Sequence, residues 1–258
     1  MRGRALAACL LVLWLAGAGS ARSEALVAAL SSDRVRIESN FTGTEIVVFG
    51  EIVRDFATVA RADPYDIAVI VTGPEQDVTT RRKQRFLGLW VNRDAETFIG
   101  VPGFYAAHVT RPVGDLAQRN TLERFQIGLH NISLRVLEDS PVPISERFDF
   151  RNAFLRLLIR NGLYSERAGS VEFLSDSLFR TTIPIPSNVP VGAYKVRTYL
   201  LRGGALLASQ ENDLTIAKTG FEQLTYTAAY KYSAIYGAVA VFLALFTGWL
   251  AGVIFRRD

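Results

Sequence analysis

The chain has 258 residues, with 29 basic and 25 acidic side chains and 49% hydrophobic residues. Setting aside Arg2, Arg4, Arg256, Arg257 and Asp258 leaves 25 basic and 24 acidic residues, so the central part is almost neutral. This balance excludes a nucleic-acid binder, which needs a clear basic excess. The only cysteine, Cys9, lies in the N-terminal apolar segment, so the rest of the chain forms no disulfide or thiolate site.

The first 25 residues have the composition of a secretory signal peptide. Arg2 and Arg4 precede an apolar run from Ala5 to Gly19, and small residues follow at 20, 21, 23 and 25. A charged start, a short apolar core and an Ala-x-Ala-like exit define such a signal, which is removed from the mature protein. We expect cleavage after Ala21 or Ala25, with an uncleaved N-terminal anchor as the alternative.

Residues 26–113 are expected to form a β-sandwich-like region. Apolar or β-branched runs at 34–38, 44–52, 66–72, 86–91 and 97–109 are separated by polar residues, glycine and proline. Short strands at this spacing favour an antiparallel sandwich. The run Val69-Ile70-Val71 predicts a strand buried on both faces, in a central position.

Residues 114–166 are expected to form a helical segment. Asn120 to Glu123 resembles a capping box, with Leu122, Phe125 and Leu129 able to share one helix face. A second helix is indicated by an apolar stripe and by the stop signal Asn161-Gly162. The residues of this stripe are Phe150, Phe154, Leu157 and Leu158.

Strands return in residues 167–217, with Gly203-Gly204 as a two-residue hairpin turn. These strands either complete the first sandwich or form a second small module. The overall prediction is a mainly β fold with a helical insertion (α+β): an immunoglobulin-like antiparallel sandwich followed by one C-terminal transmembrane helix.

A stalk of residues 218–232 leads to the predicted transmembrane helix, 233–255. This stretch contains no charged residue and is long enough to cross a bilayer. Tyr230, Tyr232 and Tyr236 suit the headgroup layer, and Arg256 and Arg257 in the tail 256–258 favour a cytoplasmic C-terminus. We therefore expect a single-pass protein of the bacterial inner membrane, with a periplasmic body.

Small residues recur every four positions along this helix, at Ala240, Ala244, Gly248 and Gly252. Such a stripe lets a second helix approach closely. It predicts a helix–helix contact, with a membrane-protein partner or in a homodimer. Besides the lipid bilayer, this is the partner that the sequence indicates.

The motifs of hydrolases, P-loop proteins and zinc enzymes are missing, and His108 and His130 have no second ligand at metal spacing. We expect no cofactor, no metal and no catalytic residue.

Two features of the body are candidates for a partner surface. The densest basic run contains Arg81, Arg82, Lys83 and Arg85, either as charges protecting a strand edge or as a patch for anionic headgroups or an acidic partner. Trp90 and the pair Phe104 and Tyr105 are expected in the core, with a binding surface as the alternative for the aromatic residues.

The stretches "SDRVRIESNFTGTEIVVFG" and "RFLGLWVNRDAETFIGVPGFYAAHVTRP", with the single C-terminal span, resemble the alphaproteobacterial putative transmembrane protein family. The resemblance covers nearly the whole mature chain and implies a bacterial single-pass protein, without a catalytic residue to carry over. Members encoded near a sulfite-exporter-like permease suggest a transporter accessory role. The leading hypothesis is a non-enzymatic protein-interaction module. The alternatives are a periplasmic enzyme or ligand-binding protein that uses scattered acids and arginines, and a cell-envelope structural or stress protein.

Overall fold

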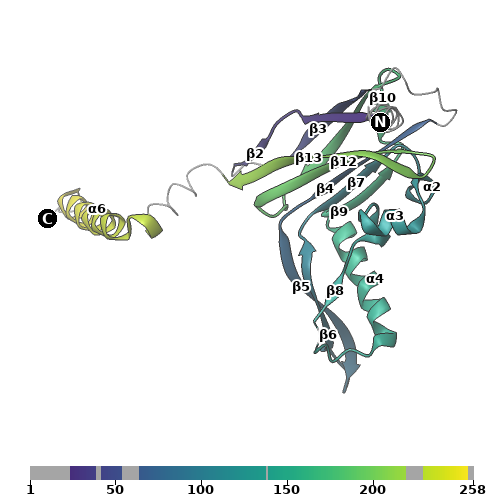
Figure 1. Cartoon of the computed structure of the whole chain (residues 1–258). Helices are drawn as coiled ribbons and strands as arrows, with labels where there is room; N and C mark the ends of the chain where they lie inside the picture. The colour runs from purple at the N-terminus through teal and green to yellow at the C-terminus, as the bar shows by residue number, and fades with distance from the viewer. Residues whose placement is uncertain (1–23, 39–41, 54–63, 138, 219–228, 255–258) are drawn as a thin grey trace, which may run out of the picture.

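The computed structural model describes residues 24–38, 42–53, 64–137, 139–218 and 229–254 (Figure 1). The expected signal segment and the tail with Arg256 and Arg257 lie outside these residues, apart from Glu24 and Ala25. The strands are β1 (Ala25–Leu30), β2 (Arg34–Ile37), β3 (Gly43–Val53), β4 (Tyr65–Thr72), β5 (Glu75–Phe86), β6 (Leu89–Pro102), β7 (Tyr105–Val109), β8 (Arg135–Val136), β9 (Tyr164–Ala168), β10 (Val171–Phe173), β11 (Leu178–Pro186), β12 (Gly192–Arg202) and β13 (Ala205–Lys218). The helices are α2 (Val113–Leu116), α3 (Arg119–Arg124), the 3-10 turn η1 (Leu129–Asn131), α4 (Ile144–Arg160) and α6 (Ser233–Ile254).

The body is mostly β, and its two larger sheets pack face to face. One sheet has the order β1-β3-β11-β10 and the other β2-β13-β12-β4-β7-β9. Alternate residues of β3 and β11, such as Val48 and Ile183, meet Val69 and Val196 of the second sheet in one buried cluster. The sandwich-like, mainly β fold expected from the sequence is therefore confirmed.

Helices cover the outer face of the six-stranded sheet. Ile70, Ala107 and Leu201 point away from the first sheet and pack in a second buried cluster with Phe154 of α4 and Leu122 of α3. Strand β4 lies between these two cores, because its residues alternate in side-chain direction and both directions are buried. The central, doubly buried strand expected at 69–71 is confirmed.

The strands that follow the helices share sheets with the strands that precede them. β11 pairs antiparallel with β3, and β12 pairs antiparallel with β4. The Gly203-Gly204 turn between β12 and β13 is present, with both glycines at positive φ. Between β4 and β11 the chain inserts the long β5–β6 hairpin and then the helices.

Helix α4 confirms the predicted stripe in large part. Phe150, Phe154 and Leu158 are buried, whereas Leu155 takes the buried position expected for Leu157. The helix begins earlier than its apolar stripe, directly after Pro143, and it ends before Asn161 and Gly162, whose φ is +71°.

Other expectations were wrong in detail. Helix α3 begins at Arg119 and has no side-chain cap, so Asn120 does not start a capping box. The strand expected at 86–91 is interrupted by the hairpin turn at Leu87 and Gly88, with Phe86 in β5 and residues 89–91 in β6. The strand expected at 97–109 is divided at Gly103 and Phe104. Residues 164–166, expected in the helical segment, lie in β9, which pairs parallel with β7.

Phe104 and Tyr105 are buried, so core packing is confirmed for this pair and their assignment to a partner surface was wrong. The hydroxyl of Tyr105 donates to the carbonyl of Gln126 and accepts from the amide of Gly128, both at 2.8 Å. Tyr105 thereby fixes the turn after α3 against the sheet. Its burial raises the pKa of its hydroxyl, which stays protonated.

Helix α6 agrees closely with the predicted span. Residues Ser233–Gly252 have a mean hydropathy of 2.0 and no buried residue, so the helix is long enough and apolar enough to cross a bilayer. The hydroxyl of Thr247 donates to the carbonyl of Leu243 at 2.7 Å, which satisfies a polar side chain within the apolar stretch.

Candidate functional site

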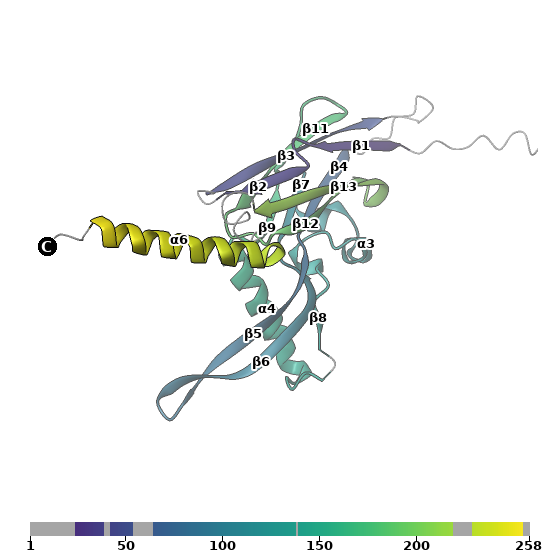
Figure 2. The same cartoon turned by 90° about the vertical axis from the view of Figure 1, so that its left-hand side faces the viewer.

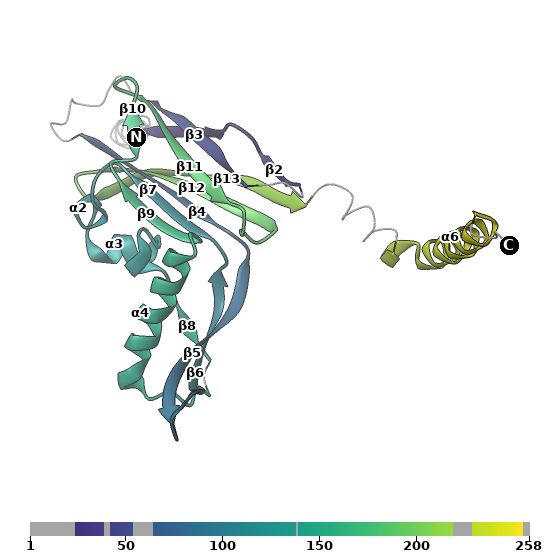
Figure 3. The same cartoon turned by 180° about the vertical axis from the view of Figure 1, so that it is seen from behind.

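The β5–β6 hairpin extends away from the two sheets as an arm, with α4 beside it (Figures 1, 2 and 3). At its end Phe86 pairs with Leu89, which leaves Leu87 and Gly88 as a two-residue turn. The φ angles of these two residues are +47° and +86°, as a type I′ hairpin turn requires at both central positions. The sequence therefore reverses direction within an apolar stretch.

The end of the arm, here called the tip, is an exposed apolar surface. Its side chains are 57%, 88%, 70%, 70% and 39% exposed, in the order Phe86, Leu87, Leu89, Trp90 and Val91. Single exposed apolar residues are common on protein surfaces, but a contiguous group indicates a contact with another molecule or a membrane. The expectation that Trp90 lies in the core was therefore wrong.

Leu87 is an unfavourable residue for its backbone conformation. Asparagine, aspartate or glycine normally occupies the first position of a type I′ turn, because a Cβ atom strains a residue at positive φ. The leucine side chain is the most exposed of the tip and gains no burial in exchange. Strain of this kind, without a benefit to folding, indicates that the side chain serves a contact outside the chain.

Three of the four predicted basic residues lie together beside the tip. Arg81, Lys83 and Arg85 alternate along β5, are exposed and share one face of the arm. Trp90 is directly opposite Arg85 in the hairpin register, so it belongs to the same face. The arm thus presents cations next to apolar side chains.

Arg82 does not belong to this basic face, and its assignment to the partner surface was wrong. Its guanidinium bonds to Asp94 at 2.7 Å and to Glu146 of α4 at 2.5 Å, and it lies over the ring of Phe150 at 5.4 Å. Hydrogen bonds to Asp94 and then to Glu146 raise the pKa of Arg82. Arg82 is therefore a structural residue that joins the arm to α4.

A second ion pair supports the arm nearer the body. Glu96 of β6 is buried, and its carboxylate lies 3.8 Å from Nε of Arg147. Phe98, two residues further along β6, packs against Phe154 of α4 at 4.9 Å between ring centroids. Helix α4 thus contacts the arm at two places, at Arg82 of β5 and at Glu96 and Phe98 of β6. These contacts hold the tip at a defined position.

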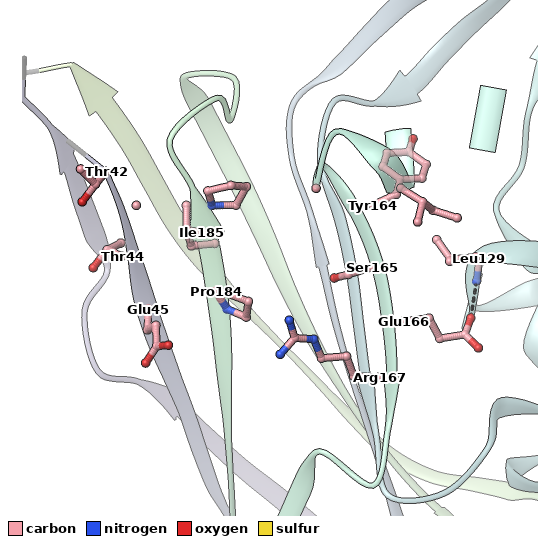
Figure 4. A pocket seen from close by; sticks show the side chains of 14 residues that line it. Thr42, Thr44, Glu45, Leu129, Tyr164, Ser165, Glu166, Arg167, Pro184 and Ile185 are labelled. Atoms are coloured by element: carbon pink, nitrogen blue, oxygen red, sulfur yellow. Dashed lines mark hydrogen bonds between the residues drawn. The ribbon is translucent and has the colours of Figure 1, made fainter. Parts of the chain in front are cut away.

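A separate cleft of about 670 Å³ opens between the edges of the two sheets (Figure 4). Ser165 and Arg167 of β9 face Glu45 of β3 and Pro184 of β11 across it, whereas Glu166 points away and accepts the amide of Leu129 at 2.8 Å (Figure 4). The cleft therefore combines one exposed cation with one exposed carboxylate. Among the described residues there is no group of three potential metal ligands.

His108 lies buried between the two sheets. Thr181 donates its hydroxyl proton to the carbonyl of Ser170 at 2.8 Å, so it accepts the Nδ1 proton of His108 at 2.9 Å. Nε2 is then the deprotonated nitrogen, and within the described part of the chain it has no hydrogen-bond partner. Burial, and then the charge of Arg167, lower the pKa of His108 to about 4.

The residues predicted for the membrane helix are on one continuous helix. Ala240, Ala244, Gly248 and Gly252 lie along α6, and a Cβ atom added at either glycine would meet open space. Their contact with a second helix stays a prediction. Tyr230, Tyr232 and Tyr236 are exposed around the start of α6.

The apolar tip is the feature that sequence reasoning missed. Its signal was Gly88 within "RFLGLWV", because a glycine in an apolar run next to a basic run is compatible with a turn. The predicted basic residues and the missed aromatic residue lie together because β5 and β6 are adjacent antiparallel strands.

Among the described residues, a mostly β body is followed by one helix that is long and apolar enough to cross a bilayer, so the class of protein is a candidate transmembrane protein. The sequence matches the family described as putative transmembrane protein (Alph_Pro_TM) over residues 25–257. The chain belongs to this alphaproteobacterial family. A comparison with curated proteins finds no match.

Proposed function

We propose that the protein is a membrane-anchored, non-enzymatic interaction module that binds its partner through the tip of the β5–β6 arm. The observation that carries this proposal is the group of exposed apolar side chains at the tip, beside the cations of β5. Interaction surfaces are enriched in aromatic residues and arginine, and rigid presentation lowers the cost of binding. Helix α6 supplies the anchor.

The proposed orientation has the body in the periplasm and the C-terminus in the cytoplasm. Arg256 and Arg257 follow α6 directly in the sequence, and basic residues next to a span favour the cytoplasmic side. The predicted signal segment supports the same orientation, since it would direct the body across the inner membrane.

We further propose that the body is an immunoglobulin-like module with an inserted arm. The sheet orders β1-β3-β11-β10 and β2-β13-β12-β4-β7 correspond to A-B-E-D and A′-G-F-C-C′ of that fold. Tyr194, near the start of β12, donates its hydroxyl to the carbonyl of Pro190 at 2.5 Å, in the manner of a tyrosine corner. The parallel β7–β9 pair departs from the pattern.

A narrower form of the proposal is an accessory role for an inner-membrane transporter. The small-residue stripe of α6 would then contact one of the helices of a permease. An anchored body needs only modest intrinsic affinity for a partner in the same membrane, because tethering raises the effective concentration.

Photo-crosslinking in intact cells tests the proposal. A benzoylphenylalanine in place of Trp90 is expected to form crosslinked products at the membrane, with protein or with lipid. The same residue in place of Val27, which is 55% exposed on β1, is the matched control and should give none. Equal yields at both positions, or no product from position 90, would contradict the proposal.

The cleft favours a second candidate function, the binding of a small ligand. Arg167 and Glu45 could pair with a ligand that carries both charges, and the half-buried Pro184 offers apolar contact. A thermal-shift screen should then find ligands that stabilise the wild type and not Arg167→Ala. Stabilisation of both variants alike would remove the cleft as the binding site.

A further inference from the structure

We infer that the partner of the tip is an anionic lipid surface: the arm inserts its apolar turn into the headgroup layer of the membrane that holds α6. The inference deepens the proposed function and rests on it, because that function leaves the chemical class of the partner open. Its basis is the pairing of an exposed apolar turn with a basic face that has no acidic residue of its own.

The charge of the arm is one-sided. From Thr79 to Arg93 the sequence contains five basic residues and no acidic residue. Arg82 is neutralised by Asp94 and Glu146, which leaves Arg81, Lys83, Arg85 and the exposed Arg93. Lysine and arginine near an anionic leaflet each contribute to attraction, and this attraction acts only within a Debye length. These cations are within a few residues of the tip, as such attraction requires.

The apolar side chains are of the kinds that enter the interface. Tryptophan is favoured at the headgroup layer because its ring is amphipathic, and leucine and phenylalanine contribute apolar area below it. Leu87 and Leu89 lie on either side of Gly88 at the outermost point of the hairpin, with Trp90 one residue behind. A two-residue turn is convex, so lipid headgroups can close around it.

The arm is also long enough to act at a distance from its sheet. β5 runs from Glu75 to Phe86, so at about 3.4 Å per residue it is roughly 37 Å long. Residues 219–232 connect β13 to α6, and a chain spans at most about 3.5 Å per residue, so the anchor lies within roughly 50 Å of the end of β13. The tether thus keeps the body, and the arm with it, within reach of the bilayer that contains α6, so weak insertion is sufficient.

A fluorescent probe on the tip of the full chain tests this inference. Cys9→Ser removes the native cysteine, and Leu87→Cys carries an environment-sensitive nitrobenzoxadiazole dye. The protein is reconstituted through α6 into vesicles of phosphatidylcholine alone or mixed with phosphatidylglycerol, some with brominated acyl chains. We expect a blue-shifted emission and quenching by bromine in the anionic vesicles, and neither at the matched control position Val27→Cys.

Variants in the same Cys9→Ser, Leu87→Cys chain then measure the contributions of charge and of apolar area to insertion separately. Replacing Arg81, Lys83 and Arg85 by glutamine should lower the equilibrium constant for insertion about fivefold for each cation removed. Trp90→Ala should lower it roughly tenfold. High salt should weaken insertion of the wild type more than that of the triple glutamine variant, which keeps only Arg93 of these cations. All of these side chains are exposed, so the variants are expected to fold.

A probe at position 87 that remains in water in both kinds of vesicle overturns the inference. Insertion that is equal in neutral and anionic vesicles also overturns it, because the basic face would then have no part in binding. If the vesicles fail but position 90 crosslinks to a protein in cells, the proposed function stands and its partner is a protein. If both fail, the proposed function fails as well.

Discussion

Leu87 and His108 are two single residues whose properties depend on the folded structure. Leu87 holds a strained conformation at the end of the arm, whereas His108 is a titratable group enclosed between two sheets. Neither role is visible in the residue type alone. Each depends on backbone geometry and packing that only the folded chain supplies.

Replacement of Leu87 by asparagine should separate stability from binding. Asparagine tolerates positive φ better than leucine, so the free energy of unfolding should rise by about 0.5–1 kcal/mol. The same change removes the most exposed apolar side chain of the tip, so crosslinking from position 90 should decrease. Urea unfolding of the full chain in detergent measures the first effect. A loss of stability would contradict the turn assignment.

His108 should make the body less stable in acid. The imidazole titrates near pH 6.5 in the unfolded chain and near 4 in the folded chain. The folded state therefore has its full stability above pH 6.5, loses it as the pH falls from 6.5 to 4, and changes little further from this group below 4. The loss amounts to about 3 kcal/mol.

Denaturation of the wild type and of His108→Gln across this pH range tests the prediction. The glutamine amide can donate to Thr181 but does not titrate. The unfolding free energy of the wild type should therefore fall relative to that of the variant as the pH is lowered from 6.5 to 4. A constant difference would show that His108 does not titrate between the sheets as described.

Among the helices and strands, those whose buried residues recur with a regular period are predicted best from the sequence. β3, β4, β12 and α4 were found because alternating or helical apolar patterns face a core. β5 was missed because its distal residues are exposed on the basic face and paired with charges on the other, which leaves no apolar alternation. The parallel edge strand β9 is short, and its exposed residues look like a loop.

The candidate site was predicted only in part, because its exposed residues form no regular apolar pattern. The basic run was recognised from composition, but the sequence could not distinguish Arg82 from its neighbours, because its partners Asp94 and Glu146 are distant in sequence. The Gly88 turn within an apolar run decides that Trp90 is exposed. Only the hairpin register shows that Trp90 and Arg85 are on one face.

The joint between the arm and α4 gives a prediction at this scale. Asp94→Ala removes the acceptor shared by Arg82 and Gln84, and the pair is partly exposed, so the expected cost is about 0.5–1 kcal/mol. Amide exchange in residues 79–91 should become up to about fivefold faster. Glu172→Ala, which removes an exposed ion pair with Arg180 elsewhere, should leave the arm unchanged. Equal effects of both variants would contradict a joint at Asp94.

For the whole molecule, the contacts of Glu24 and Ala25 favour one of the two expected signal cleavage sites. Glu24 is buried and accepts a bond from Arg202 at 2.8 Å, and Ala25 pairs with Val53 in β1. Cleavage after Ala25 would remove both, whereas cleavage after Ala21 keeps them. We therefore predict a mature chain that begins at Arg22. Intact-mass spectrometry of the membrane-extracted protein measures this, and a mature N-terminus at Leu26 would contradict it.

Helix α6, the sandwich and the arm each have a separate role in the proposed function. In the proposed function, α6 holds the protein in the bilayer, the two sheets and the helices form the body, and the arm places an apolar and basic tip at a distance from this body. This account requires the tip to be covered in the native membrane and uncovered when the membrane is removed.

Hydroxyl-radical footprinting of Trp90 tests that requirement most directly. The oxidation rate of Trp90 is compared in native membrane vesicles and in detergent solution, with Phe173, which is 40% exposed on β10, as the internal control. The account predicts that Trp90 is oxidised several-fold more slowly in the membrane, while Phe173 reacts at the same rate in both. Equal oxidation of Trp90 in membrane and detergent would contradict the account.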